Sequence, residues 1–262
     1  MTEQTQNTGS QTTVRPMFFN KLITLDRQLH ADMKFDTQAG YAFAAKTHLI
    51  PITIAEFRFV ARQYPIIFSA GEVPMPFAVV GLRENTNLMV DDEGKWRWRS
   101  YIPGAVHTYP FILLPVRKDS DEISVVIDPT ATSLGDQGEA LFADGQPTPL
   151  LDRIVQLTNQ FRAGMMATIA FGKTIAQAGL LSPRGVELLL QDGSKFRIDN
   201  FLTLDPEKID KVANNIFLRW RKEGDLLPIY QYLQSMDSWT MIADLESDRR
   251  AAAKAVAKIE EA

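Results

Sequence analysis

The chain predicts an α+β fold, in which an antiparallel β-meander has flanking helices in the C-terminal half. Short apolar runs separated by Gly, Pro, Asn and Asp fill residues 65–128, and helix signals dominate after Asp128. A hydrophobic content of 45% over 262 residues is enough for a sizeable core. We expect one domain over residues 17–250, a disordered tail at 1–16 and a helical or frayed charged tail at 251–262.

Strands and one helix are expected in the first half of the chain. FFNKLITL and GYAFAA are typical of short strands. Apolar side chains recur at steps of three and four between Thr53 and Gln63, which predicts a helix that ends before Pro65. A meander is expected next, with a hairpin turn at Asp91-Asp92-Glu93-Gly94. Its strands are PIIFSA, PFAVVGL, NLMVD, KWRWRSYI, YPFILLPV and EISVVID.

Helices dominate the second half. Thr148 can cap a helix that has Pro149 at its first position, and the apolar stripe that follows continues to about Gly179. The remaining expected elements are a two-stranded hairpin that turns at Asp192-Gly193, a helix from Asp205 to Gly224, a short helix at 226–233 and a last helix from Ser238.

Composition excludes several classes of function. The net charge of -4 and the pI of about 5.5 argue against a general affinity for nucleic acid or anionic membranes. Without cysteine the chain has no disulfide, thiolate nucleophile or iron-sulfur cluster. The polar start MTEQTQNTGSQTTVRP does not resemble a signal peptide, so we expect a cytoplasmic location by default. The longest apolar runs fall far short of the ~20 residues of a transmembrane helix.

Two tryptophans stand in a basic run. If KWRWRSYI is a strand, Trp96 and Trp98 point to one face, and Arg97 and Arg99 point to the other. Exposed tryptophans would form a stacking platform for a ligand, whereas buried ones would belong to the core, which is the interpretation we favour. Arg97 and Arg99 would then form an exposed cationic face for a carboxylate or phosphate.

One pair of neighbouring residues, an acid followed by an amide, has no structural explanation in the sequence. Asp199 and Asn200 follow a basic strand and indicate either a turn or part of a polar pocket, so they join the candidate ligand-binding residues. Asp205 is explained as a helix N-cap, and Glu56 as an acidic residue in the first turn of a helix.

One metal site is conceivable as an alternative. His30 and Asp32 have the His-x-Asp spacing of a two-histidine-one-carboxylate iron site, His107 offers a second histidine, and Arg117 offers a cation for an oxoacid cosubstrate. This set would suit a 2-oxoglutarate-dependent oxygenase. No GxSxG, GxxxxGK[ST] or GxGxxG motif is present, so no catalytic residue or cofactor is assigned otherwise.

From about Phe18 to Leu245 the chain resembles the bacterial SapC family. The resemblance rests on LDRQLHADMKF, IPITIAEFRFVARQYPIIF, NLMVDDEGKWRWRSYIPGAVHTYPF, LFADGQPTPLL, GSKFRIDNFLTLDPEKI and LLPIYQYLQSM, in this order. The family is named after a surface-layer-associated protein, and its relatives are often labelled as peptide or drug transport proteins. The resemblance implies a non-enzymatic accessory protein that binds a peptide, a protein or a surface component, with signal-independent export to the cell surface as an alternative location.

Overall fold

The computed structural model describes residues 15–117 and 120–260, and it confirms the α+β class and the antiparallel sheets. The α-helices in these ranges are α1 (Phe57–Val60), α2 (Gly104–Thr108), α3 (Pro149–Gln177), α4 (Pro206–Asp210), α5 (Asn214–Glu223), α6 (Leu226–Ser235) and α7 (Trp239–Glu260). Short 3-10 turns are η1 (Ala42–Ala44), η2 (Ile54–Glu56) and η3 (Met236–Ser238). The predicted tail at 1–16 lies almost entirely outside the described residues, whereas residues 251–260 continue α7.

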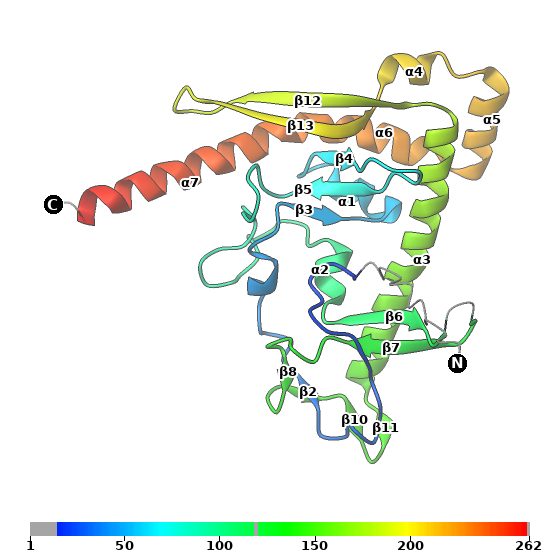
Figure 1. The fold of residues 1–262 in the computed structure, drawn as a ribbon, viewed down its shortest axis with the longest axis vertical. Coiled ribbons are helices and arrows are strands. Elements are labelled where there is room, and N and C mark those ends of the chain that lie inside the picture. Colours follow the sequence, from blue (N-terminus) through cyan, green and yellow to red (C-terminus); the bar gives the residue numbers. More distant parts are fainter. Residues whose placement is uncertain (1–14, 118–119, 261–262) are drawn as a thin grey trace, which may run out of the picture.

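The largest sheet has five strands from distant parts of the chain. Its order is β12-β13-β4-β5-β3, and all neighbours are antiparallel. The strands are β3 (Leu49–Pro51), β4 (Ile66–Phe68), β5 (Pro76–Val79), β12 (Leu181–Leu189) and β13 (Lys195–Leu204). The predicted turn at Asp192-Gly193 is confirmed, since it joins β12 to β13. β13 pairs with β4 at one position only, Leu202 opposite Phe68, so the end of the hairpin nearest its turn extends past β4 (Figure 1).

The predicted meander over residues 65–128 is divided between separate sheets. Its first strands, β4 and β5, join the five-stranded sheet, whereas β6 (Phe111–Pro115) and β7 (Ile123–Ile127) pair with β1 (Ile23–Thr24). NLMVD and KWRWRSYI form no strand and share one isolated bridge between Val90 and Trp96. The remaining strands are β2 (Lys34–Phe35), β8 (Leu134–Gly135), β9 (Glu139–Ala140), β10 (Phe142–Ala143) and β11 (Gln146–Pro147).

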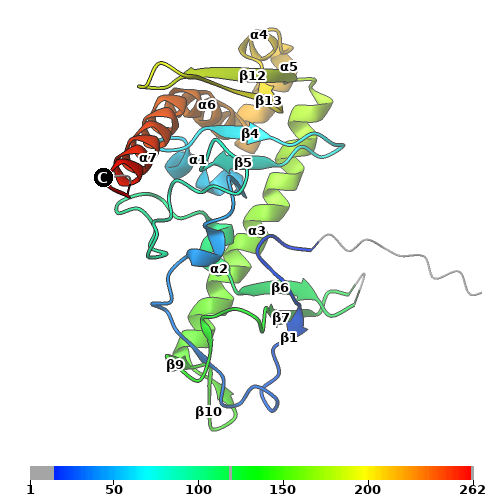
Figure 2. The ribbon, with the colours of Figure 1, turned by 60° about the vertical axis from the view of Figure 1, so that its left-hand side comes forward.

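Helix α3 connects the two sheet regions. It passes beside the five-stranded sheet and beside β6 and β7, as both orientations of the molecule show (Figures 1 and 2). The predicted cap is confirmed, because the Thr148 side chain accepts a hydrogen bond from the amide of Leu151. The predicted end is also confirmed, with Gly179 just past the helix at φ +66°. Thr168 of α3 accepts a hydrogen bond from the amide of Ile54 at 2.9 Å, which ties the helix to η2.

The helix expected from Asp205 to Gly224 is interrupted. Asp205 caps α4 as predicted, since its carboxylate accepts from the amide of Glu207. The chain then leaves helical geometry, and Ala213 takes an extended conformation before α5 begins. Gly224 ends α5 in a left-handed conformation with φ +91°, as its position predicts. The sequence correctly placed both ends of this region but missed the break between them.

Two strand predictions near the N-terminus are wrong in part. FFNKLITL contributes only Ile23–Thr24 as strand, and GYAFAA forms η1 instead. The buried carboxylate of Asp128 explains the irregular path before β1, because it accepts hydrogen bonds from the amides of Asn20 at 2.6 Å and Lys21 at 3.3 Å. Hydrogen bonds from this segment to a side chain about a hundred positions away leave no signal in the local sequence.

The main apolar core lies between the five-stranded sheet and the helices packed on it, and a smaller cluster lies around β6, β7 and the first turn of α3. The largest fully buried side chains of the main core include Trp220, Tyr64, Tyr232, Phe57 and Phe68. None of the helices within the described ranges combines the length and the apolarity that a bilayer span would need.

Candidate functional site

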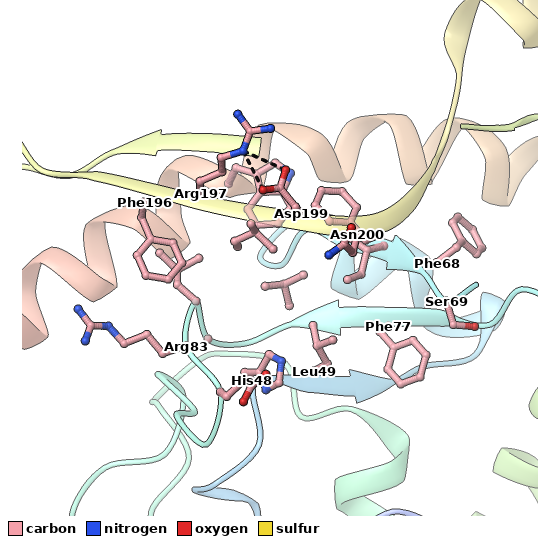
Figure 3. A pocket seen from close by; sticks show the side chains of 18 residues that line it. His48, Leu49, Phe68, Ser69, Phe77, Arg83, Phe196, Arg197, Asp199 and Asn200 are labelled. Atoms are coloured by element: carbon pink, nitrogen blue, oxygen red, sulfur yellow. Dashed lines mark hydrogen bonds and ion pairs between the residues drawn. The ribbon is translucent and has the colours of Figure 1, made fainter. Parts of the chain in front are cut away.

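A cleft of about 570 Å³ lies between β13 and the strands β3, β4 and β5 (Figure 3). It collects residues from β3 and the position before it, from β4 and β5, from the loop after β5, and from β13. The lining residues are His48, Leu49, Ile67, Phe68, Ser69, Phe77, Val79, Gly81, Leu82, Arg83, Glu84, Phe196, Arg197, Ile198, Asp199, Asn200, Phe201 and Trp239.

The strand register gives the cleft an apolar floor. Leu49 lies opposite Val79, and Ile67 lies opposite Phe77. Because side chains alternate along a strand, these four side chains share one face of the sheet. The alternate positions point to the other face and are completely buried: Ile50, Ile66 and Ala78. Leu49 and Phe77 are only partly buried, whereas Ile67 and Val79 on the same face are buried, so the open part of the floor lies at Leu49 and Phe77.

A β-bulge shapes the wall that β13 contributes. Pairing with β12 is interrupted at Gly185, which stands opposite two residues, Asp199 and Asn200. Asn200 has φ +66°, a left-handed conformation that is uncommon for residues other than glycine. A Cβ atom at Gly185 would lie 2.2 Å from Oδ1 of Asp199, so the Asp199 side chain occupies the space beside this glycine. Bulges and strained residues are common beside binding sites, where they redirect side chains.

An ion pair occupies the same wall. Nε of Arg197 donates to both carboxylate oxygens of Asp199, at 3.0 and 2.8 Å. The hydrogen bond from Arg197 lowers the pKa of the Asp199 carboxyl. The pair carries no net charge, and it lies on the side of β13 that faces away from β3 and β5 (Figure 3).

Arg83 supplies a second guanidinium from the loop after β5. Its Nε donates to the buried carboxylate of Glu246 on α7 at 3.0 Å, and its Cζ lies 6.0 Å from the ring centroid of Phe196. The same ion-pair network contains four cations and two carboxylates, so it carries two net positive charges: Arg83, Arg249, Arg250 and Lys254 with Glu246 and Asp192. Of these six residues, Arg83 lines the cleft.

The tryptophans predicted to share a face do not do so. Trp96 is 9% exposed and donates from Nε1 to the carbonyl oxygen of Tyr101 at 3.2 Å, whereas Trp98 is 84% exposed. The inward orientation is thus confirmed for Trp96 and wrong for Trp98. The alternation fails because the chain turns after Trp96: Arg99 has φ +61°, and the amide of Ser100 bonds to the carbonyl of Arg97. Trp98, Arg97 and Arg99 lie outside the cleft.

The three residues of the alternative iron site do not meet. Nδ1 of His30 interacts with the backbone of Asp26. His107 lines a different hollow of about 720 Å³, which contains neither His30 nor Asp32. Within residues 15–117 and 120–260, no group of three His, Asp or Glu side chains is arranged to hold a metal ion. No observation favours the oxygenase.

Of the six candidate ligand-binding residues, the structure places two, Asp199 and Asn200, at the cleft. Arg197, which was not a candidate, lines the cleft beside them. Sequence reasoning missed His48, Leu49, Phe77, Arg83 and Phe196. Only the bulge left a usable signal: Asp and Asn tolerate left-handed geometry inside a strand, and a glycine stands across from them. The other residues meet because strands distant in sequence pair, which no local pattern reveals.

Comparison with known proteins adds one finding. Residues 25–242 match the sequence profile of the SapC family, which covers most of the chain. No curated protein and no solved structure showed a significant similarity to the chain.

Proposed function

This chain belongs to the SapC family, and we propose that it is a non-enzymatic binding protein whose cleft holds an apolar ligand with an anionic group. The cleft volume of about 570 Å³ supports the proposal, since small-molecule sites enclose roughly 300 to 1,000 Å³ and combine apolar walls with a few placed polar groups. The proposal rests on one observation: an apolar floor and the guanidinium of Arg83 line the same cleft.

The two parts of the cleft suit two parts of a ligand. Leu49 and Phe77 present apolar surface, so a hydrocarbon or aromatic group gains free energy by leaving water there. Arg83 uses Nε for Glu246, and its terminal nitrogens have no hydrogen-bond acceptor among the described residues. A ligand carboxylate at this rim would take the place of water on those nitrogens.

A C-terminal peptide residue belongs to this ligand class, with its side chain on the floor and its carboxylate at Arg83. The proposal therefore includes the peptide-handling role that the family names imply. The cytoplasmic location and the alternative of export to the surface both stay predictions, and fractionation of the native host distinguishes them.

Binding of 1-anilinonaphthalene-8-sulfonate, an aromatic anion, tests the proposal. We expect enhanced dye emission on saturable binding, and displacement by decanoate at concentrations at least about tenfold lower than by decan-1-ol, because only the former has an anionic group. Phe77→Asp should abolish dye binding. Arg83→Gln should remove the preference for decanoate over decan-1-ol.

Arg27→Gln is the matched control, since Arg27 is exposed, lies outside the cleft and carries the same charge. Its dye titration should match that of the unmodified protein. Equal displacement by decanoate and decan-1-ol, or unchanged dye binding in a folded Phe77→Asp variant, would overturn the proposal.

A further inference from the structure

Beyond the cleft, a second surface combines arginines with exposed aromatic rings. It comes from two segments. The first is α1 together with Arg62 just beyond it, and the second is the loop after Trp96. We call it the arginine-tryptophan surface and define it as Arg58, Phe59, Arg62, Arg97, Trp98 and Arg99, all of which are exposed.

Contacts between the two segments hold this surface together. Gln63, just beyond α1, donates from Nε2 to the carbonyl of Arg99 at 3.4 Å and accepts from the amide of Tyr101 at 2.6 Å. Phe59 stacks on Tyr101 with ring centroids 5.2 Å apart and an interplanar angle of 14°. The guanidinium of Arg58 lies 4.4 Å from the Phe59 ring centroid. The two segments therefore form one arranged surface.

The charge of this surface is opposite to that of the chain. None of its four arginines forms an ion pair with a carboxylate in the part of the chain that the structure describes. The whole chain carries a net charge of -4. Four positive charges gathered on an acidic protein attract an anionic partner to this one place.

The aromatic rings add a second requirement for the partner. Trp98 is 84% exposed and Phe59 is 40% exposed, so both leave apolar area in contact with water. Burying an aromatic ring removes roughly 150 to 250 Å² from water. A partner that covers Trp98 with an apolar side chain gains the free energy of removing this area from water, in addition to the attraction of the charges.

We infer that the arginine-tryptophan surface docks an acidic segment of a partner protein, with carboxylates on the arginines and an apolar side chain against Trp98. Tryptophan and arginine are the residues that carry most energy in protein interfaces, whereas lysine is depleted there. The basic residues of this surface are all arginines. Nucleic acid and anionic membranes are less well matched, since the chain as a whole is acidic and would be repelled by an extended polyanion.

A random dodecapeptide display library, panned on the full chain, tests the inference. Selected peptides should be enriched in Asp and Glu around an aromatic or aliphatic residue. Synthetic copies should bind the Arg97→Ala/Arg99→Ala variant at least about tenfold more weakly. Replacing their Glu by Gln should weaken binding to the same extent, and raising the salt concentration should weaken binding to the unmodified protein.

The matched control is Arg221→Ala/Lys222→Ala, which removes two exposed charges from α5 and should bind the peptides as the unmodified protein does. Thermal unfolding of both double variants verifies that they are folded. Selected peptides without acidic enrichment, or equal binding by the two double variants, would overturn the inference. It also fails if vesicles with 30% phosphatidylglycerol or a single-stranded 12-mer DNA bind through Arg97 and Arg99 and no acidic peptide does.

Discussion

Two hairpin turns in this molecule have similar sequences and different outcomes. The turn at Asp91–Gly94 and the turn at Asp192-Gly193 both place a glycine with positive φ, +77° and +79°, before a basic and aromatic run. The second joins strands of nine and ten residues, whereas the first is followed by a single bridge between Val90 and Trp96.

Support from outside the turn explains the difference. The second hairpin is held at its turn by α7, where Arg250 donates to Ser194 at 2.8 Å and Ser247 accepts from the amide of Gln191 at 3.1 Å. In the first hairpin, the chain that follows the turn is held by Gln63, which forms hydrogen bonds with the backbone on both sides of Ser100. A turn signal therefore predicts where the chain reverses, while contacts from distant residues decide how far the strands continue.

Trp96→Ala is the largest expected perturbation of the first hairpin. The ring is buried, packs edge-on against Tyr41 and donates to Tyr101, so its removal empties a core site. We expect a loss of about 3 to 5 kcal/mol in the free energy of unfolding. Urea unfolding followed by circular dichroism measures it, and a loss below about 1 kcal/mol would show that Trp96 does not anchor this segment.

Glu246→Gln tests the support of the second hairpin. The buried carboxylate binds Arg83, Arg249 and Arg250, and Arg250 in turn reaches Ser194. We expect a loss of about 2 to 3 kcal/mol near neutral pH, because three guanidinium groups lose their shared anion but remain partly in contact with water. Urea unfolding measures this loss, and an unchanged stability would remove α7 as the explanation for the longer hairpin.

The pH dependence of this effect has a defined sign. Burial on its own would raise the pKa of the Glu246 carboxyl, but hydrogen bonds and charges of the arginines outweigh it and lower the pKa. A lowered pKa stabilises the fold above the unfolded value of about 4.3, and this stabilisation is lost as the pH falls through the lower folded value. The stability difference between the unmodified protein and Glu246→Gln should therefore shrink below about pH 4.3. A difference that grows on acidification would contradict this assignment.

The turn glycines allow a smaller, paired comparison. Alanine at either position is strained, since an L side chain at positive φ costs about 1 kcal/mol or more. At Gly193 the added Cβ would meet nothing within 4 Å, whereas at Gly94 it would lie 3.0 Å from Cβ of Ala42. We expect Gly193→Ala to cost about 1 kcal/mol and Gly94→Ala about 2 kcal/mol in thermal unfolding. Equal costs would mean that the first turn is not packed against η1.

Those features of the fold that depend on neighbouring residues could be predicted from the sequence. Thr148 and Pro149 begin α3, Gly224 ends α5, and Asp205 caps α4, because a cap side chain or a left-handed glycine acts within a few positions. The break before α5 was missed because apolar spacing continues through it. The irregular start of the chain was missed because Asp128 fixes it from far away.

The candidate site was less predictable than the fold. The sequence indicates a turn or a polar pocket at Asp199 and Asn200, whereas in the structure both lie within β13, at the bulge opposite Gly185. The apolar floor of the cleft could not be predicted, because it depends on the pairing of β3 with β5 and on the separation of β13 from β4 after one position. Strand pairing of this kind is a tertiary property, and an alternating pattern such as KWRWR is equally compatible with a loop that presents one tryptophan to solvent.

Trp98→Phe is the smallest expected perturbation of stability and the sharpest test of this loop. The ring contributes little to the core at 84% exposure, so the free energy of unfolding should change by less than about 0.5 kcal/mol. Trp96, Trp220 and Trp239 are buried, so iodide should quench mainly Trp98, and more strongly than caesium because Arg97 and Arg99 attract the anion. The variant should lose this iodide-sensitive emission while it unfolds as the unmodified protein does. Iodide quenching that persists in Trp98→Phe would place another indole at the surface and would contradict the burial of Trp96, Trp220 and Trp239.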